Sequence, residues 1–231
     1  MEISITLIII IITCITSFAA FSNQDLMNKL IFYPPAVSKQ KEWWRFFSCG
    51  LVHADIAHLV FNMFALYIFG EGQSMGPGLR KSGLEYDFIE IFGNKGKALY
   101  LGMYVLALGI CLIPTFKKNI NNYYYKSLGA SGAVSAVVFA AIFLKPLGYM
   151  GMLFIPVFIV SFLFGAIYLG FTYYLDKRGD SNINHSAHMW GSLFGVVYFY
   201  FACLLFSDYP ALSMFIEQIK SFSLSQIFRL G

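Results

Sequence analysis

The sequence predicts an all-α membrane protein whose transmembrane helices pack into one six-helix bundle. Two observations lead to this prediction. Of the 231 residues, 58% are hydrophobic and only 12% are charged, which is about half the charged share of a soluble domain. The charged residues also leave six long uncharged windows along the chain. A soluble fold of this size could not bury so much apolar surface, so residues 1–231 are expected to form a single membrane domain.

The first four windows predict spans at residues 3–22, 56–70, 98–116 and 129–145. A spanning helix needs about 20 mainly apolar residues, and fewer suffice where other helices surround it. The first window contains the run Ile8–Ile12, and no lysine or arginine precedes it. A signal peptide normally begins with such positive charge, so we expect this window to be a retained span.

The last two windows predict spans at residues 152–175 and 185–206. Pro146, Gly148 and Gly151 stand at the start of the fifth window. Because proline and glycine interrupt helices, the fifth helix is expected to begin near Met152. The sixth window opens with a polar stretch that ends at Ser186.

Two segments outside the spans differ from the other connections. Residues 71–97 are polar and rich in glycine, which is typical of a flexible connector. Residues 207–231 contain Phe215, Ile219 and Phe222 at helical spacing, with charged residues between them. This pattern predicts an amphipathic tail along the membrane surface rather than another span.

Charge and cysteine content exclude several classes of function. The formal net charge is +4 and the basic residues are scattered, so nucleic acid is not an expected partner. The four cysteines form no CxxC pair, so neither a disulfide framework nor a zinc site is indicated. No cofactor and no metal are expected.

The histidines are the unusual residues of this chain. All four fall at the starts of two predicted spans, His53 and His58 at the second and His185 and His188 at the sixth. Asn62 follows His58 by four residues, and the two therefore share one face of a helix. Ionisable groups inside a membrane are costly, which makes each of them a candidate functional residue.

A serine stands at the start of the fourth span, in the run Gly129-Ala130-Ser131-Gly132. The first residues of a helix lie beside free N–H groups and the positive end of the helix dipole, where a developing oxyanion is stabilised. Such a run can also serve only close helix packing. Gly191 and Gly195 share a face with His188, and small residues there would bring that histidine close to a neighbouring helix.

Four motifs together resemble the rhomboid family of intramembrane serine proteases. They are Trp44-Arg45, His53-x4-His58-x3-Asn62, Gly129-Ala130-Ser131-Gly132 and Ala187-His188-x2-Gly191. They occur in the family's order on the expected spans, and the resemblance covers residues 40 to 206. It implies a rhomboid-like bundle of six transmembrane helices.

The resemblance implies a role for each matching residue. Ser131 would be the nucleophile and His188 its base, in a dyad without a carboxylate. Asn62, His58 and the Ser131 backbone N–H would form the oxyanion hole. Trp44 and Arg45 would anchor the first loop at the interface, where an arginine commonly snorkels outwards. The remaining supporting positions would be His53, Gly129, Gly132, Gly191 and Gly195.

The sequence departs from the family pattern at two places. Members often carry a tyrosine one turn after the nucleophile, packed on the catalytic histidine, and Ser135 stands there in this chain. The histidine must then be held in another way. Residues 73–87 resemble an insertion.

The family reading implies transmembrane proteins as substrates and the lipid bilayer as surroundings. Substrates would enter laterally beside the fifth span, under a cap formed by residues 176–184. The chain carries no basic, serine-rich presequence, so a multi-pass position in the plasma membrane is expected, with the site towards the extracytoplasmic side. The sequence does not indicate an oligomeric state.

Two alternatives belong to other functional classes. A catalytically silent relative could bind membrane clients without cleaving them, although such a protein would be free to lose Ser131 or His188. A metal-dependent enzyme could use the histidines, but HExxH is absent and the spacing from His53 to His58 is poor for one helical face.

Overall fold

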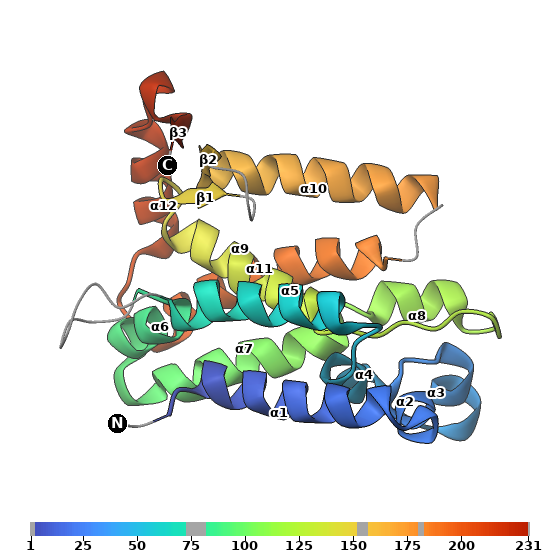
Figure 1. Cartoon of the computed structure of the whole chain (residues 1–231). Coiled ribbons are helices and arrows are strands. Elements are labelled where there is room, and N and C mark those ends of the chain that lie inside the picture. The colour runs from blue at the N-terminus through green and yellow to red at the C-terminus, as the bar shows by residue number, and fades with distance from the viewer. Residues whose placement is uncertain (1–2, 73–81, 152–156, 180–182, 231) are drawn as a thin grey trace.

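The fold is mostly helical (Figure 1). The computed structural model describes residues 3–72, 82–151, 157–179 and 183–230. Its first half contains the helices α1 Ile5–Phe21, α2 Gln24–Leu30, α3 Pro34–Gln40, α4 Arg45–Ser48, α5 Ile56–Leu66, α6 Leu84–Phe92, α7 Gly96–Ile110 and α8 Ile113–Asn119. Its second half contains α9 Ser131–Leu144, α10 Ser161–Arg178, α11 His185–Phe206 and α12 Ala211–Lys220, and the strands β1 Tyr149–Gly151, β2 Val157–Val160 and β3 Phe228–Leu230.

Several helices are apolar enough to lie in a membrane. Two helical runs, Leu84–Asn119 and His185–Phe206, have the length and hydropathy of a spanning helix. A third candidate joins Arg45–Leu51 to Ile56–Glu71 across a bend of 97°. The helices Ile5–Phe21 and Ser131–Leu144 are apolar but shorter. Among the described residues this makes two or three candidate spans by length and composition.

The fifth predicted span begins later than the sequence indicated. Residues 152–156 lie outside the described residues, and Val157–Val160 form the strand β2 rather than helix. The strand pairs antiparallel with β1 on one side and with β3 on the other. Its residues favour a strand because Val157, Ile159 and Val160 are β-branched. The helix α10 therefore starts only at Ser161.

Part of the predicted polar connector is helical. Residues 73–81, which include most of the expected insertion, lie outside the described residues, but Leu84–Phe92 form α6. Leu84, Phe88 and Phe92 are spaced by four residues and all are buried. This spacing puts them on one helical face. The glycines nearby led the sequence analysis to predict a flexible connector instead of this helix.

The helix α9 lies at the centre of the bundle, and α5, α7, α10 and α11 pack against it. Most of its side chains are buried. Its closest neighbour is α11, where Gly191 and Gly195 face the backbone of Gly132 and Ala136. Even a methyl group on either α11 glycine would overlap the facing carbonyl oxygen. The two helices can approach this closely only because both positions lack a side chain.

Buried carboxylates attach the start of α1 to the rest of the bundle. The Glu85 side chain accepts hydrogen bonds from the backbone N–H groups of Ile5 and Thr6, each at 2.8 Å. Ser4 bonds to Glu71 and also accepts from the Leu7 N–H, so it caps α1. These contacts satisfy N–H groups that the first turn of a helix leaves free, and they place negative charge at the positive end of its dipole.

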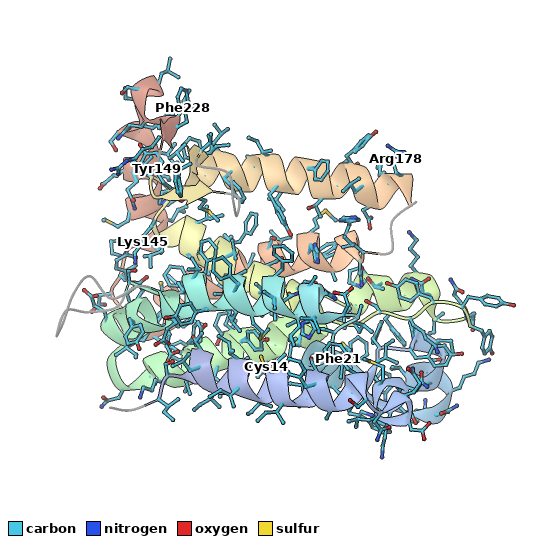
Figure 2. The ribbon with its side chains drawn as sticks, viewed as in Figure 1. Cys14, Phe21, Lys145, Tyr149, Arg178 and Phe228 are labelled. Atoms are coloured by element: carbon cyan, nitrogen blue, oxygen red, sulfur yellow. The ribbon has the colours of Figure 1, made fainter. Side chains whose placement is uncertain are left out.

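The C-terminal tail packs on the segment that leads into α10. The strand β3 pairs with β2, and Phe222 packs edge-on against Phe162 with ring centroids 5.0 Å apart. Figure 2 shows Tyr149 and Phe228 together at one end of the molecule, with Arg178 at the opposite end. Ala211–Lys220 of the predicted tail form the helix α12. After the short 3₁₀ helix Leu224–Gln226, Phe228–Leu230 form the edge strand β3.

We predict that Gly195→Ala destabilises the protein by about 1–3 kcal/mol, because overpacking forces the backbones of α9 and α11 apart. Gly170→Ala is the matched control, since it lies in α10 and the added methyl group would have no described atom within 4 Å beyond its own stretch of helix. The measurement is the thermal unfolding midpoint of each variant in detergent. Equal midpoints for both variants would show that the α9–α11 contact does not require glycine.

Candidate active site

Ser131 and His188 lie side by side in the structure. The Ser131 Oγ is 2.7 Å from the His188 Nε2, a hydrogen bond between residues 57 positions apart. Ser131 is the first residue of α9, and His188 lies in the first turn of α11. Within the described residues no carboxylate bonds to His188. The pair therefore has the geometry in which an imidazole accepts the proton of a serine hydroxyl.

The backbone before Ser131 has an unusual conformation. Gly129 has φ +109°, and a Cβ at this position would lie 2.7 Å from the His58 ring. The Gly129 N–H donates to the Cys49 carbonyl at 2.9 Å. A residue with a side chain is disfavoured here both by the positive φ and by the histidine. The glycine thus lets the chain turn into α9 directly against His58.

The start of α11 is set by Asn184, which the sequence analysis did not identify. Its Oδ1 accepts from the Ala187 N–H at 3.1 Å and from the Thr115 hydroxyl at 3.1 Å. Its Nδ2 donates to the Ser127 hydroxyl at 3.4 Å. Asn184 thereby caps α11 and ties it to α8 and to the segment before α9. An asparagine directly before a predicted helix is an N-cap signal that could have been recognised.

Asn62 and His58 lie on α5 and line the same cavity as the dyad. The Asn62 Nδ2 donates to the His58 carbonyl at 2.9 Å, which uses one of its two N–H bonds. The Ala54 N–H points at the His58 Nδ1 over 3.5 Å. This contact favours the tautomer with the proton on Nε2, beside Gly129. Both side chains can therefore donate to an oxygen in the cavity.

The cavity above the dyad has a volume of about 660 Å³. It is lined by residues from α5, from the segment before α9 and from the start of α11, and Lys126 stands among them. A second, apolar groove of about 280 Å³ reaches Ser131 from the side. Phe61 of α5 and Phe164 of α10 are among the groove's lining residues. Ser131 thus borders both the cavity and the groove.

Ser135, which stands where other family members often have a tyrosine, faces α10. Its hydroxyl lies 3.5 Å from the Tyr168 hydroxyl on α10, and the Tyr168 ring packs on Phe139 at 5.8 Å. The ring that lies next to His188 is that of His185, with centroids 6.0 Å apart and an edge-to-face geometry. His185, which the sequence analysis left without a role, is itself buried.

Arg45 does not snorkel outwards as the sequence suggested. Its guanidinium is buried and donates to the carbonyls of Asn28 and Ile31, at 2.9 and 2.7 Å, and it also pairs with Glu42. Asn28 lies in α2, and Ile31 directly follows that helix. A planar guanidinium satisfies several carbonyls at once, which draws Arg45 inwards. The neighbouring Trp44 is about half exposed.

The expected cap at residues 176–184 is described only in part, because residues 180–182 lie outside the described residues. No three side chains of His, Cys, Asp and Glu come together as a metal site within the described ranges.

Comparison with known proteins gives two matches. A family model described as the Rhomboid domain matches residues 40–205. The chain is also 32% identical over 143 residues to RHOMBOID-like protein 12, mitochondrial, of Arabidopsis thaliana. That alignment covers 61% of this chain but only 40% of the plant protein.

We predict that Gly129→Ala destabilises the protein more than Gly93→Ala does. Both glycines have positive φ, which is strained for alanine, but only at Gly129 would the methyl group meet another side chain, that of His58. Thermal unfolding midpoints of the two variants in detergent measure the difference. A midpoint for Gly129→Ala at or above that for Gly93→Ala would contradict the prediction.

Proposed function

The chain belongs to the rhomboid family, and from this premise we propose that it is an intramembrane serine endopeptidase. It would hydrolyse peptide bonds in or near transmembrane segments of other membrane proteins. The observation that carries the proposal is the 2.7 Å contact between the Ser131 Oγ and the His188 Nε2. A serine is a weak nucleophile until a base in hydrogen-bond reach accepts its proton.

The proposed reaction passes through an acyl-enzyme. The Ser131 Oγ attacks the scissile carbonyl carbon while the His188 Nε2 takes the hydroxyl proton. The C–N bond then breaks, and His188 gives that proton to the leaving amine. A water molecule, deprotonated by His188, attacks the ester, and the Ser131 oxygen leaves with the proton. Serine and histidine thus return to their starting state.

Three donors are proposed to stabilise the tetrahedral oxyanion. They are the second N–H bond of the Asn62 amide, the His58 Nε2–H and the Ser131 backbone N–H at the free end of α9. They come from two helices that already hold their positions, so little reorganisation accompanies the reaction. A preorganised donor of this kind contributes on the order of 3 kcal/mol to lowering the barrier.

We propose that the membrane arrangement has six spans, formed by α1, α5, the α7–α8 pair, α9, α10 and α11. The central α9 has 14 residues, or about 21 Å at 1.5 Å per residue, against a hydrocarbon core of about 30 Å. It can be short because other helices rather than lipid surround it. Its first residue, Ser131, then lies below the membrane surface, with the 660 Å³ cavity above it as the route for water.

The proposed location is the plasma membrane, with the cavity towards the extracytoplasmic side. An organelle membrane is the other candidate, since the similar plant protein is named as mitochondrial. A catalytically silent protein that binds membrane clients is the competing function. Against it stand the retention of Ser131 and His188 and the hydrogen bond between them.

We predict that a fluorophosphonate serine probe labels the detergent-purified protein and that Ser131→Ala abolishes the labelling. His188→Ala should reduce the labelling rate by at least about 1,000-fold, because the serine then has no base. Ser192→Ala is the control, since Ser192 is also on α11 but donates to the His188 carbonyl instead of facing Ser131.

Each outcome of the labelling decides between the two functions. Equal labelling of the parent and Ser131→Ala would mean that another residue reacts. A folded parent that is labelled neither in detergent nor in lipid would overturn the protease proposal in favour of the silent client-binding protein.

We further propose that substrates reach Ser131 through the apolar groove between α5 and α10. The Tyr168–Ser135 contact would have to open as α10 moves away from α9. A segment that unwinds readily, with glycine, alanine, serine or proline near the outer face, would be preferred, because a helix shields its peptide bonds.

We predict that bridging α5 to α10 blocks proteolysis but not labelling by a small probe. The double variant Phe61→Cys with Phe164→Cys, joined by a bifunctional thiol reagent, should cleave a transmembrane substrate at least about tenfold more slowly. The bridge prevents α10 from moving away to admit the substrate. The single-cysteine variants treated with the same reagent are the controls. Unchanged cleavage by the bridged protein would rule out this route.

A further inference from the structure

His53 is completely buried, and both of its ring nitrogens are engaged. The Nε2 lies 3.3 Å from the backbone nitrogen of Ala130, the residue before Ser131. The Nδ1 lies 3.0 Å from the hydroxyl of Ser17, on the first helix α1. One imidazole thus bridges two parts of the chain that are more than 100 residues apart.

The partners determine where the protons lie. A backbone N–H can only donate, so the His53 Nε2 must accept from Ala130 and carry no proton. The Nδ1 then carries the proton and donates to the Ser17 oxygen. Ser17 in turn donates its own proton to the Leu51 carbonyl at 2.9 Å. Every donor in this chain of hydrogen bonds has one acceptor.

The surroundings keep His53 neutral. The pKa of His53 is lowered to about 4, mainly by burial and also by the nearby His58, while Asp55 opposes the shift. The His53 and His58 rings are 5.0 Å apart in an edge-to-face contact. A protonated His53 would point a second N–H at the Ala130 N–H, and this bond would be lost.

The Ala130 N–H directly precedes the Ser131 N–H at the start of α9, so its hydrogen bond affects the position of the Ser131 N–H. Gly129 is held by its bond to the Cys49 carbonyl and Ala130 by its bond to His53. These two contacts fix the direction in which the chain turns into α9, at the positive φ of Gly129. The next N–H along the chain is that of Ser131, and a misplacement of about 1 Å at a reacting centre can cost roughly 100-fold in rate.

We propose that His53 and Ser17 are positioning residues, through which α1 holds the Ser131 backbone N–H in place for the oxyanion. This role rests on the proposed serine chemistry. The hydrogen bonds of His53 to Ala130 and Ser17, however, neither contact substrate nor take part in proton transfer. The first helix thereby contributes to catalysis although none of its residues lines the cavity around Ser131. Removing either hydrogen bond should therefore lower the rate of acylation and leave substrate binding unchanged.

We predict that Ser17→Ala lowers kcat and the fluorophosphonate labelling rate by about 10- to 100-fold, with KM unchanged. Thr13→Ala is the matched control, because Thr13 lies one turn earlier on α1, is equally buried, and its hydroxyl has no partner among the described residues. His53→Gln, which can place an amide oxygen near the Nε2 position, should retain more activity than His53→Phe, which offers no acceptor.

A second measurement tests the hydrogen bonds without relying on activity. In a spectrum of the ¹⁵N-histidine-labelled protein, with the His53 signals assigned by their loss in His53→Gln, we expect the Nδ1–H tautomer, unprotonated down to about pH 4. In Ser17→Ala the Nδ1 signal should shift, whereas in Thr13→Ala it should not.

The outcomes separate this inference from the proposed function. An Nε2–H tautomer of His53 would overturn the inference whether or not the protein is active. Equal labelling rates for the parent, Ser17→Ala and a folded His53→Phe would also overturn it, while leaving Ser131 as the nucleophile. A parent that shows the expected tautomer but no labelling would remove the proposed catalytic function together with the positioning role.

Discussion

The close contact between α9 and α11 is the constraint on which the site depends. Ser131 and His188 meet because Gly132 and Ala136 on one helix face Gly191 and Gly195 on the other, without intervening side chains. In a membrane, lipid chains are as apolar as the helix surfaces, so close van der Waals contact replaces the hydrophobic effect as the driving force between helices. The same small residues that hold α9 against α11 also set the distance between Ser131 and His188.

Buried polar groups then connect the outer elements to this central pair. Arg45 satisfies the carbonyls of the first loop, Glu85 accepts from the start of α1, and Asn184 joins α11 to α8. Each of these groups would be costly to bury alone, and in a membrane the penalty is larger because water cannot substitute for a missing partner. Such bonds therefore specify one arrangement of the helices, whereas apolar contacts alone would let the helices slide past one another.

One side of the site is held by hydrogen bonds, and the other is formed mainly by apolar contacts. The segment before Ser131 is held by Cys49, by His53 and by the packing of Gly129 on His58. On the other side, α10 meets α9 through apolar contacts and the long Tyr168–Ser135 contact, and the C-terminal strand holds the segment that leads into it. In the proposed protease this division would keep the oxyanion donors in place while a substrate enters beside α10.

The sequence by itself determined the membrane character, the ends of the sixth helix at His185 and Phe206, and the residues that could carry chemistry. Hydropathy and motif order are local properties, which explains why they could be read directly. Only the tertiary structure decided that Leu84–Phe92 is a helix, that Val157–Val160 is a strand, and that Arg45 points inwards. It also decided that Ser17 and Ala130 share His53. The orientation of Arg45 and the bonds of His53 depend on partners far away in the chain, and a single sequence contains no signal for which distant donor meets which acceptor.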